Sequence, residues 1–562
     1  MDLKKELTQY LIKELKLKEI TLETPNNTNL GDFALPCFIL SKQRKKSPID
    51  ISKDLEVSLK KPKYISNIIS NGPYLNFFID KVYLAKSILE KIIKETNNYG
   101  QGKKSKYTVL IESPGPNTNK PLHLGHVRNM LLGSTLANLN KKIGNNTIKV
   151  DIVNDRGIHI CKSMLAYKKF GSNKKPNKKS DHFVGDFYVL YDKESKKDPN
   201  LEKELNQMLI KWESDNKLIR DLWKKMNKWV LDGFKETYKR FDTKIDKTYY
   251  ESNYYNQGKE IIKKGLKKGI FKKDEFGNII MDLTKENLDK KVVLRADGTS
   301  IYITQDIALA DIRYNDFKMD KMIYVVGNEQ LYHFKVLFEI LKKLNYKFTD
   351  NLHHLAYGYI SLPEGKMKSR EGIVVDADNL ANEMHELAKK GILERNKGIS
   401  KQELEIISEQ IAMGALKFFM LKYDPMKDFI YNPKESIKFE GETGPYVQYS
   451  AVRIKSILKK SKIKKDNVNY SLLKDPSEER IITLLSNYPQ IIRKSALEYK
   501  SSILCKYLID LSKEFNTFYH KCQVIDINNR ELTKTRLVLI KAIYYVLEDG
   551  LKQLGIKIPS RM

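Results

Sequence analysis

Residues 107–126 read YTVLIESPGPNTNKPLHLGH, and this stretch decides the fold class. It begins with a short apolar, β-branched run (107–113) that is typical of a buried strand. A helical pattern follows through residue 144, and a second strand-like run, NTIKVDIVND, occupies residues 146–155. Strand, loop, helix and strand in this order predict a βαβ unit, and therefore an α/β, Rossmann-like parallel sheet.

The motif His123-Leu124-Gly125-His126 stands where the predicted loop meets the helix. The N–H groups of a helix N-terminus favour anions such as polyphosphate. Gly125 lets a flat base approach the backbone, and two imidazoles three residues apart can donate to phosphate oxygens as charge develops. The H-x-x-H pattern alone also fits two surface histidines or a metal pair. The strand before it and the helix after it favour phosphate binding.

A second motif is the basic loop EGKMKSREG at residues 364–372, which follows a strand-like segment. Its lysines, Lys366 and Lys368, stand on either side of Met367 and suit a loop that closes over polyphosphate. In a chain so rich in lysine, a solvated lysine turn is the ordinary alternative for such a loop taken alone.

On both sides of these motifs, the hydrophobic and turn patterns of the sequence predict three domains. Residues 1–95 predict an α+β domain that opens with an amphipathic helix and includes SNGPYLNFFID (70–80), a turn into a strand. Residues 96–400 hold the α/β sheet, interrupted by a lysine-rich insertion around 171–260 and resumed at 291–304 and 321–327. Helical patterns dominate residues 401–562 and predict an all-α bundle.

Composition narrows the class of protein. The 562 residues include 101 Lys and Arg against 70 Asp and Glu, a net charge of +31, which attracts polyanions and nucleic acid above all. A general Lys and Asn bias would produce part of this excess, so charge alone names no function. The chain has no apolar run of about 18 residues that would cross a membrane. Its four cysteines contain no C-x-x-C pair, which indicates a reducing cytosol without disulfides or a zinc site.

The two motifs on an interrupted parallel sheet resemble the class I aminoacyl-tRNA synthetases, and further strings resemble the arginyl-tRNA synthetases among them. The resemblance covers nearly the whole chain. The strings that carry it, beyond the two motifs, are Gly31-Asp32-Phe33, NGPYLNF (71–77), the E-x4-N-x2-K-P-x-H string from Glu112 to His123, NDRG (154–157), RADGTSIYITQD (295–306), GETGPYVQY (441–449) and the terminal PSRM.

This resemblance implies a two-step reaction in which L-arginine and ATP with Mg²⁺ give arginyl-adenylate, and tRNA(Arg) then takes the arginyl group. It implies catalytic roles for Lys120, His123, Gly125, His126, Lys366 and Lys368, with Met367 as a further ATP contact. It implies arginine contacts at Glu112, Asn117, His123, Tyr302, Asp306 and Gln330. It implies tRNA contacts at Asn71, Tyr74 and Asn76 for the elbow, and at Tyr446, Tyr449 and Tyr519 for the anticodon.

Two positions depart from the family pattern. Pro114 and Gly115 stand where the family often has a pair of serines, which puts one hydroxyl contact to arginine in doubt. Ser369 takes the place of the second lysine of the K-M-S-K-S loop, and we expect Lys120 to supply the missing cation. We also expect a cytoplasmic monomer that uses no zinc, no metal centre of its own and no membrane.

Two other functions would explain part of this pattern. A catalytically inactive tRNA-binding relative would keep the basic surface, but the intact Glu112, His123 and Asp306 argue against it. Another class I enzyme, such as the cysteinyl one, would need zinc-binding cysteines that this chain lacks. Carboxylates that face a pocket suit a guanidinium, which is planar and always charged.

Overall fold

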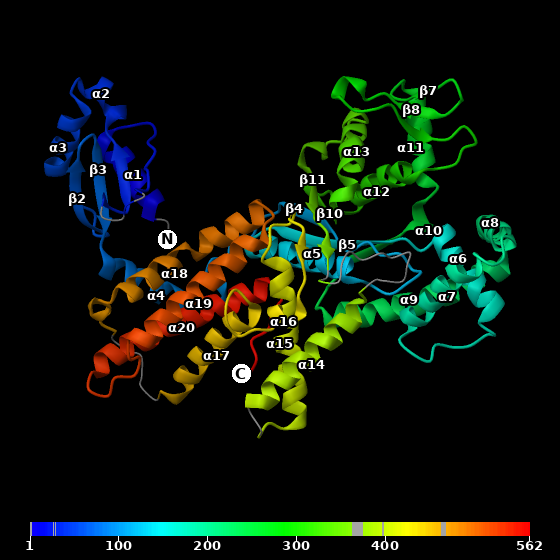
Figure 1. Cartoon of the computed structure of the whole chain (residues 1–562). Coiled ribbons are helices and arrows are strands. Elements are labelled where there is room, and N and C mark those ends of the chain that lie inside the picture. The colour runs from blue at the N-terminus through cyan, green and yellow to red at the C-terminus, as the bar shows by residue number, and fades with distance from the viewer. Residues whose placement is uncertain are drawn as a thin grey trace. The chain divides into compact units, whose positions relative to one another are not determined.

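The computed structural model describes residues 3–25, 27, 30–361, 363, 375–395, 398–461 and 468–562. These residues form two compact units, and Figure 1 labels the helices and strands of the chain. One unit comprises residues 1–99, 453–489 and 510–549, and the other comprises residues 100–452, 490–509 and 550–562.

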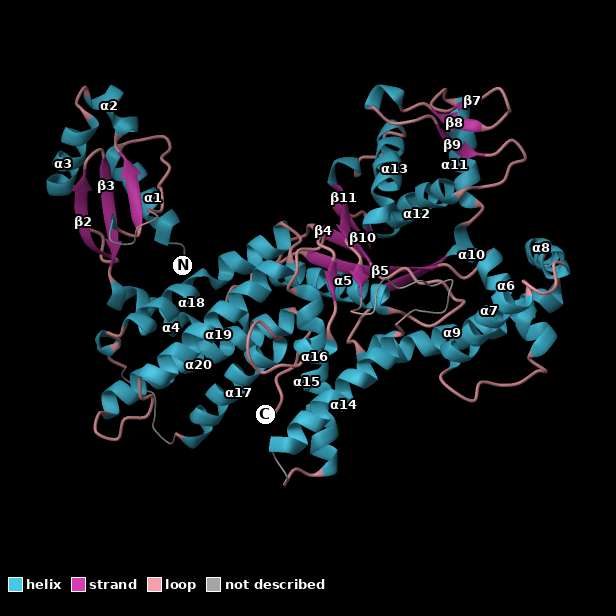
Figure 2. Cartoon of the chain, in the orientation of Figure 1, coloured by secondary structure: helices cyan, strands magenta, loops and turns pink. Residues whose placement is uncertain are grey.

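The larger unit is built on a five-stranded parallel sheet (Figure 2). Its strands are, in spatial order, β11 (Leu352–Tyr357), β10 (Lys321–Gly327), β4 (Thr108–Glu112), β5 (Asn146–Val153) and β6 (Lys247–Tyr250). The chain runs from the central β4 through β5 to β6 on one side, and later returns to β10 and β11 on the other. The predicted βαβ unit and parallel sheet are therefore confirmed, and the strand order reverses beside β4.

Helix α5 (Leu124–Lys142) connects β4 to β5 and is buried on almost every side. It contacts the sheet on one side and α14 (Ala377–Arg395) and α15 (Lys401–Leu421) on another. A helix without a polar face is stable only when it is enclosed in this way. Helices α12 (Tyr302–Phe317) and α13 (Leu331–Lys343) flank β10 in sequence and share its hydrophobic core.

The lysine-rich insertion between β5 and β6 is helical. It contains α6 (Ile158–Phe170), α7 (Ser180–Glu194), α8 (Asn200–Glu213) and α9 (Lys217–Arg240), and α10 (Glu251–Tyr254) and α11 (Gln257–Lys267) follow β6. Edge-to-face contacts among Tyr167, Phe183, Phe187 and Trp229 join α6, α7 and α9. Aromatic packing of this kind lets a segment with so many lysines fold, because the lysines stay at its surface.

The prediction that residues 291–304 rejoin the parallel sheet is wrong. Residues 291–294 form β9 (Lys291–Leu294) in a separate antiparallel sheet with β7 (Lys272–Lys273) and β8 (Ile279–Met281). Asp297 accepts a hydrogen bond from the Thr299 N–H (2.8 Å), and the Arg295 N–H donates to the Thr299 carbonyl (3.1 Å). This tight turn reverses the chain, and Tyr302 then begins α12. Residues 321–327 do form a parallel strand, as predicted.

The smaller unit contains a three-stranded antiparallel sheet of β1 (Phe33–Pro36), β3 (Tyr74–Ile79) and β2 (Ile65–Asn71). Helices α1 (Leu3–Leu15), α2 (Phe38–Arg44), α3 (Pro48–Ser58) and α4 (Lys81–Glu95) accompany it. Four leucines of α1 are buried, as their spacing of four predicts. Gly72 has a φ of 57° in the turn before β3, which confirms the predicted turn into a strand.

The C-terminal part of the chain is helical, as predicted. It contains α16 (Pro433–Ser436), α17 (Gly444–Lys460), α18 (Pro476–Leu497), α19 (Ser501–Lys521) and α20 (Arg530–Gln553). The two-residue strand β13 (Phe429–Ile430) pairs with β12 (Ile360–Ser361). All four cysteines are buried and free. Among the described helices, none combines the length and the apolar character that would let it cross a bilayer.

Candidate active site

A cavity of about 990 Å³ opens at the carboxyl ends of β4, β5 and β10. Glu112 ends β4, Asn154 follows β5, and Gly327 ends β10, and all three line the cavity. Parallel sheets bind ligands at the point where their strand order reverses, which here is beside β4. The predicted residues that line the cavity are Glu112, Asn117, His123, Gly125, His126, Tyr302, Asp306 and Gln330.

The two histidines of the HLGH motif cap helix α5 reciprocally. Nδ1 of His123, the N-cap residue, accepts a hydrogen bond from the Gly125 N–H (3.2 Å). The His123 N–H in turn donates to Nδ1 of His126 (3.1 Å), and the two ring centroids lie 3.8 Å apart. Helix N-termini leave such N–H groups without partners, and the two rings satisfy two of them. A neutral imidazole that accepts at Nδ1 carries its proton on Nε2.

Burial keeps both rings neutral. It lowers the pKa of His123 to about 4, and the nearby charge of Lys120 lowers it further in the same direction. Burial also lowers the pKa of His126 well below its ordinary value, with His123 and Lys120 as smaller causes. Desolvation disfavours the charged form of an imidazole. At pH 7 the motif therefore offers two neutral Nε2–H donors.

Lys120 lies beside the cavity rather than among its lining residues. Its ammonium is partly buried, and burial lowers its pKa. Gly185 of α7 packs against the same loop, because a Cβ at Gly185 would lie 2.7 Å from Cδ of Pro121 and 3.5 Å from Cα of Lys120. The insertion thus supports the loop that leads into α5.

Glu112 is already paired with a cation of the protein. Arg313 of α12 is fully buried and donates through Nη1 to Oε2 of Glu112. Burial raises the pKa of Glu112, and the charge of Arg313 acts in the opposite direction. A carboxylate can accept several hydrogen bonds. Glu112 can therefore hold Arg313 and still present an acceptor to a cationic ligand in the cavity.

Asp306 and Tyr302 lie one helical turn apart at the start of α12, so both face the cavity. Oδ2 of Asp306 pairs with Nε2 of His333 at 2.7 Å, and its side chain is 30% exposed. Tyr302 is 79% exposed. An accessible carboxylate beside an accessible phenol can receive the flat, multiply donating group of an arginine side chain.

Sequence reasoning did not assign three further cavity residues: Arg156, Glu251 and His333. Arg156 pairs with Glu251 (3.4 Å) and with Glu213 (2.8 Å), and its guanidinium lies 4.2 Å from the ring centroid of Tyr255. The string NDRG contains Arg156, and His333 stands three residues after Gln330, so both had a sequence signal. Glu251 stands in no such string.

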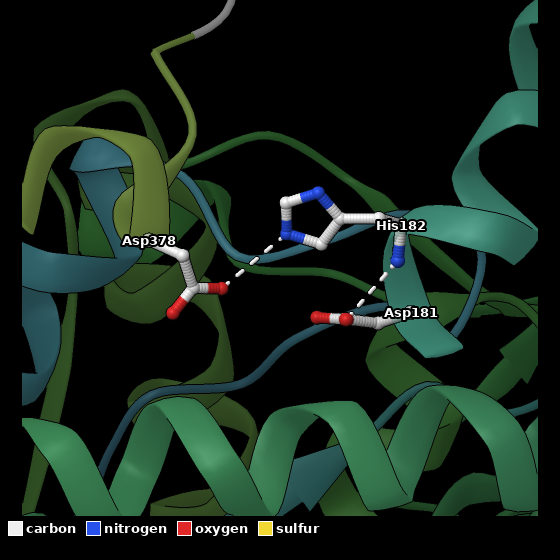
Figure 3. A group of neighbouring side chains, drawn as sticks. All are labelled: Asp181, His182 and Asp378. Carbon is white, nitrogen blue, oxygen red and sulfur yellow. Dashed lines mark hydrogen bonds and ion pairs between the residues drawn. The ribbon is translucent and has the colours of Figure 1, made fainter. Parts of the chain in front are cut away.

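A partly buried ion-pair network lies where α7 and α14 begin (Figure 3). His182 approaches Asp378 (3.3 Å), and both Asp181 and Asp378 could offer a carboxylate to a metal ion. The Lys179 ammonium, however, lies 2.9 Å from Asp181 and 2.8 Å from Asp378, and 2.7 Å from the Thr237 hydroxyl. A cation of the protein thus already occupies the space between these two carboxylates. The network fixes the start of α14, whose residue Ala377 donates to the Leu122 carbonyl beside the HLGH motif (2.9 Å).

Among the described residues that line the cavity, none belongs to the predicted basic loop or to the predicted tRNA elbow contact. Lys366, Met367 and Lys368 of the basic loop, and Ser369 with them, lie outside the described residues. Asn71 is exposed at the end of β2, but Asn76 is only 4% exposed, which argues against a direct contact with a partner.

The predicted aromatic contacts differ in exposure. Tyr74 is half-buried and packs edge-to-face on Phe38. Tyr446 and Tyr449 are half-buried in α17, whereas Tyr519 is 38% exposed and lies beneath the guanidinium of Arg453 (4.9 Å). The neighbouring Phe518 is a core residue.

Three family models match consecutive parts of the chain. The model for tRNA synthetases class I (R), catalytic domain, matches residues 88–433. The DALR anticodon binding domain matches residues 447–562, and the arginyl tRNA synthetase N terminal domain matches residues 1–79. Together these models account for most of the chain.

Whole relatives match as well. The arginine–tRNA ligase of Treponema denticola is 46% identical over 550 residues, covering 95% of this chain and 93% of the relative. That of Bacteroides thetaiotaomicron is 42% identical over 580 residues, covering 98% and 97%. The structure of the Thermus thermophilus arginyl-tRNA synthetase superposes with a TM-score of 0.83 at 24% identity, covering 100% of this chain and 99% of that one, and it shows the shared fold.

We predict that His123 and His126 keep the neutral, Nε2-protonated tautomer from pH 7 down to about pH 5. Their folded pKa values lie below the ordinary one, with that of His123 at about 4, so protonation should occur only at lower pH. ¹⁵N NMR of histidine-labelled protein, assigned with single variants, measures this. His182 is the internal control, because Asp378 raises its pKa and should leave it doubly protonated at about pH 5. A doubly protonated His123 at that pH would contradict the prediction.

Proposed function

The chain belongs to the arginyl-tRNA synthetase family, and from that premise we propose how its cavity residues divide the work of the reaction. The enzyme is an ATP-dependent ligase. It activates L-arginine with ATP to arginyl-adenylate, releasing pyrophosphate. It then transfers the arginyl group to the 3′ end of tRNA(Arg), releasing AMP.

One observation carries the proposal: a single cavity holds both the carboxylates expected for arginine and the histidine motif expected for ATP. Adenylate formation is an in-line displacement in which the arginine carboxylate attacks the α-phosphorus and pyrophosphate leaves. It needs no protein nucleophile. Positioning of the two substrates and stabilisation of the charge that develops on the phosphates supply the acceleration.

At the arginine end, we assign the guanidinium to Asp306 and Tyr302. Asp306 has an accessible carboxylate whose present partner is His333. Glu112, with Oε2 on Arg313, offers its remaining acceptor capacity to a cationic group of arginine. Asn117 and Gln330 also line the cavity and supply neutral hydrogen bonds. Discrimination then rests on charge, because a neutral side chain would leave the Asp306 carboxylate without a matched donor.

At the ATP end, we assign the phosphates to the start of α5. His123 and His126 present neutral Nε2–H donors there, and Gly125 leaves room for the nucleotide against the backbone. The helix N-terminus adds its partial positive charge. Lys120, Lys366 and Lys368 are the proposed cations for the leaving pyrophosphate, and Met367 is a further proposed ATP contact. Mg²⁺ would enter with ATP as part of the substrate.

For tRNA, we propose that residues 1–95 contact the elbow through Asn71 and Tyr74, and that residues 401–562 read the anticodon. Tyr519 is the strongest aromatic candidate, because exposed rings stack on unpaired bases. The net charge of +31 favours the same partner. Catalysis belongs to residues 96–400 in this scheme. We further propose a cytoplasmic monomer that needs no zinc.

We predict that Asp306→Asn raises the KM for arginine and lowers kcat/KM by roughly 10²-fold. The substitution keeps the shape but removes a charged hydrogen bond worth about 3 kcal/mol. The KM for ATP should change little. ATP–pyrophosphate exchange with tRNA(Arg) present measures both constants. Asp311→Asn, the same substitution on the same helix outside the cavity, is the control. An unchanged arginine KM in Asp306→Asn would show that Asp306 serves only His333.

We predict that Lys120→Ala lowers kcat for adenylate formation by on the order of 10²–10³-fold, with a smaller effect on the arginine KM. The leaving pyrophosphate needs a preorganised cation, and the basic loop lacks its second lysine. Ser369→Lys should restore part of the rate. Lys141→Ala in the last turn of α5 is the control, since that lysine is exposed. Near wild-type exchange by Lys120→Ala would leave Lys366 and Lys368 to carry the charge.

A further inference from the structure

Arg128 of α5 is a fully buried cation that binds backbone. Its Nη1 donates to the Gly358 carbonyl (2.8 Å). Its Nη2 lies within hydrogen-bond distance of the carbonyls of Pro425 (2.8 Å), Lys427 (3.1 Å) and Asp424 (3.3 Å). Arg128, on the helix that begins with the HLGH motif, thus contacts four carbonyl oxygens from two other segments, one at residue 358 and one at residues 424–427.

Two aromatic rings complete this environment. The guanidinium carbon lies 4.6 Å from the ring centroid of Phe429 and 6.0 Å from that of Tyr357. Burial lowers the pKa of Arg128 to about 10, against the opposing influence of Tyr357, Asp428 and Asp424, so the group stays charged at neutral pH. A buried charge is costly unless it is well hydrogen-bonded. The carbonyl dipoles and ring faces meet that requirement at Nη1 and Nη2, whereas Nε has no hydrogen-bond partner among the described residues.

The two segments that Arg128 joins also bind each other. The Gly358 N–H donates to the Pro425 carbonyl (2.9 Å), and the Tyr359 N–H donates to Oδ1 of Asp428 (2.7 Å). Beyond this point β12 and β13 pair through Ile360 and Phe429. Gly358 permits the close approach, because a Cβ there would lie 2.3 Å from the Asp428 carboxylate and 2.7 Å from the Met426 carbonyl.

The first of these segments is a wall of the active-site cavity. Gly358, Tyr359 and Ile360 all line it, as do His123 and His126 from the start of α5. Arg128 stands five residues after His123 on the same helix. The same rigid element therefore carries the phosphate donors at its end and, through Arg128, the attachment of another wall.

We propose that Arg128 is a positioning residue for adenylate formation. By donating hydrogen bonds to the carbonyls of residues 358, 424, 425 and 427, it fixes the wall 358–360 relative to His123 and His126, and so sets the place of ATP between them. This inference rests on the proposed binding of ATP at the start of α5. Arg128 touches neither substrate in this scheme and acts through the wall.

An arginine is required for this task. Its planar fork presents donors at fixed angles, and here two nitrogens serve four acceptors on two segments. A lysine ammonium at the same place could bind carbonyls of one segment but could not span both in the same plane. The arginine contacts are carried by other elements, chiefly β4 and α12. Loosening the wall should therefore affect ATP more than arginine.

The experiment compares Arg128→Met and Arg128→Lys in the full-length enzyme with tRNA(Arg), by arginine-dependent pyrophosphate exchange corrected for the folded fraction. We expect kcat to fall by about 10²-fold in Arg128→Met and less in Arg128→Lys, because small misplacements in an active site cost about that much. The KM for ATP should rise, while the KM for arginine should stay within about twofold. Exchange by folded Arg128→Met within about threefold of the wild-type kcat would overturn the proposal.

Lys417→Met is the matched control for lost stability. Lys417 is a buried cation of the same unit, donates to the Gly555 carbonyl (2.7 Å) and does not line the cavity. Its loss should lower the melting temperature with kcat for the folded fraction unchanged. If both KM values and kcat change alike in Arg128→Met and Lys417→Met, the role of Arg128 is only structural, and the proposal fails.

Gly358→Ala tests the same contact without touching Arg128, which keeps the proposal testable if Arg128→Met does not fold. The added methyl should push the wall from Asp428 and reproduce the lower kcat and higher ATP KM.

His123→Asn separates this inference from the proposed function. If His123→Asn is fully active while Arg128→Met is slow with a raised ATP KM, the assignment of His123 to ATP fails and the positioning role of Arg128 stands. If only His123→Asn is slow, the positioning role of Arg128 fails.

Discussion

The reversal of strand order beside β4 is the constraint on which the rest of the larger unit depends. The connection after β4 leads to β5 on one side of the sheet, and the connection after β10 leads to β11 on the other, so the two connections diverge and leave the cavity open at the carboxyl ends of these strands. Helix α5 must start at that opening, since it continues from β4. The same geometry that makes the pocket therefore delivers a helix N-terminus, with His123 as its cap, to the ligand.

The unit balances its buried charges with its own cations around this cavity. Arg313 pairs with Glu112, and Lys179 lies within ion-pair distance of both Asp181 and Asp378. Asp306 differs, because its partner His333 is an imidazole and its carboxylate stays accessible. An incoming guanidinium can therefore pair with Asp306 without first breaking a lysine or arginine ion pair. That difference in partners separates Asp306, which can take a guanidinium as its main partner, from Glu112, which can offer a ligand only the acceptor capacity that Arg313 leaves.

Sequence patterns predicted the elements whose formation is signalled by residues close together in the sequence. They located β4, α5, β5 and the HLGH motif, because apolar periodicity and a Gly between two histidines are local signals. They misassigned residues 291–304, where β-branched residues suggested a sheet strand but the turn at Asp297 reversed the chain. They also left Arg313 and Arg128 unassigned. The partners of these arginines lie far away in sequence, so only the fold reveals that the two guanidinium groups are buried.

Pro114 and Gly115 stand in the loop after β4, where the arginyl-tRNA synthetase family often has a pair of serines. They show which features of this loop can be replaced. Gly115 has a φ of 73°, and its N–H donates to Oδ1 of Asp151 (3.0 Å), whose Oδ2 accepts from the Tyr238 hydroxyl (3.1 Å). Burial raises the pKa of Asp151 to about 7. Asp151 of β5 thus holds the loop through the backbone N–H of Gly115, and no serine hydroxyl is needed to shape the loop. Positions 114 and 115 offer no side-chain donor toward the cavity, so the arginine site that we propose relies more heavily on the neighbouring Asn117 and on Asp306.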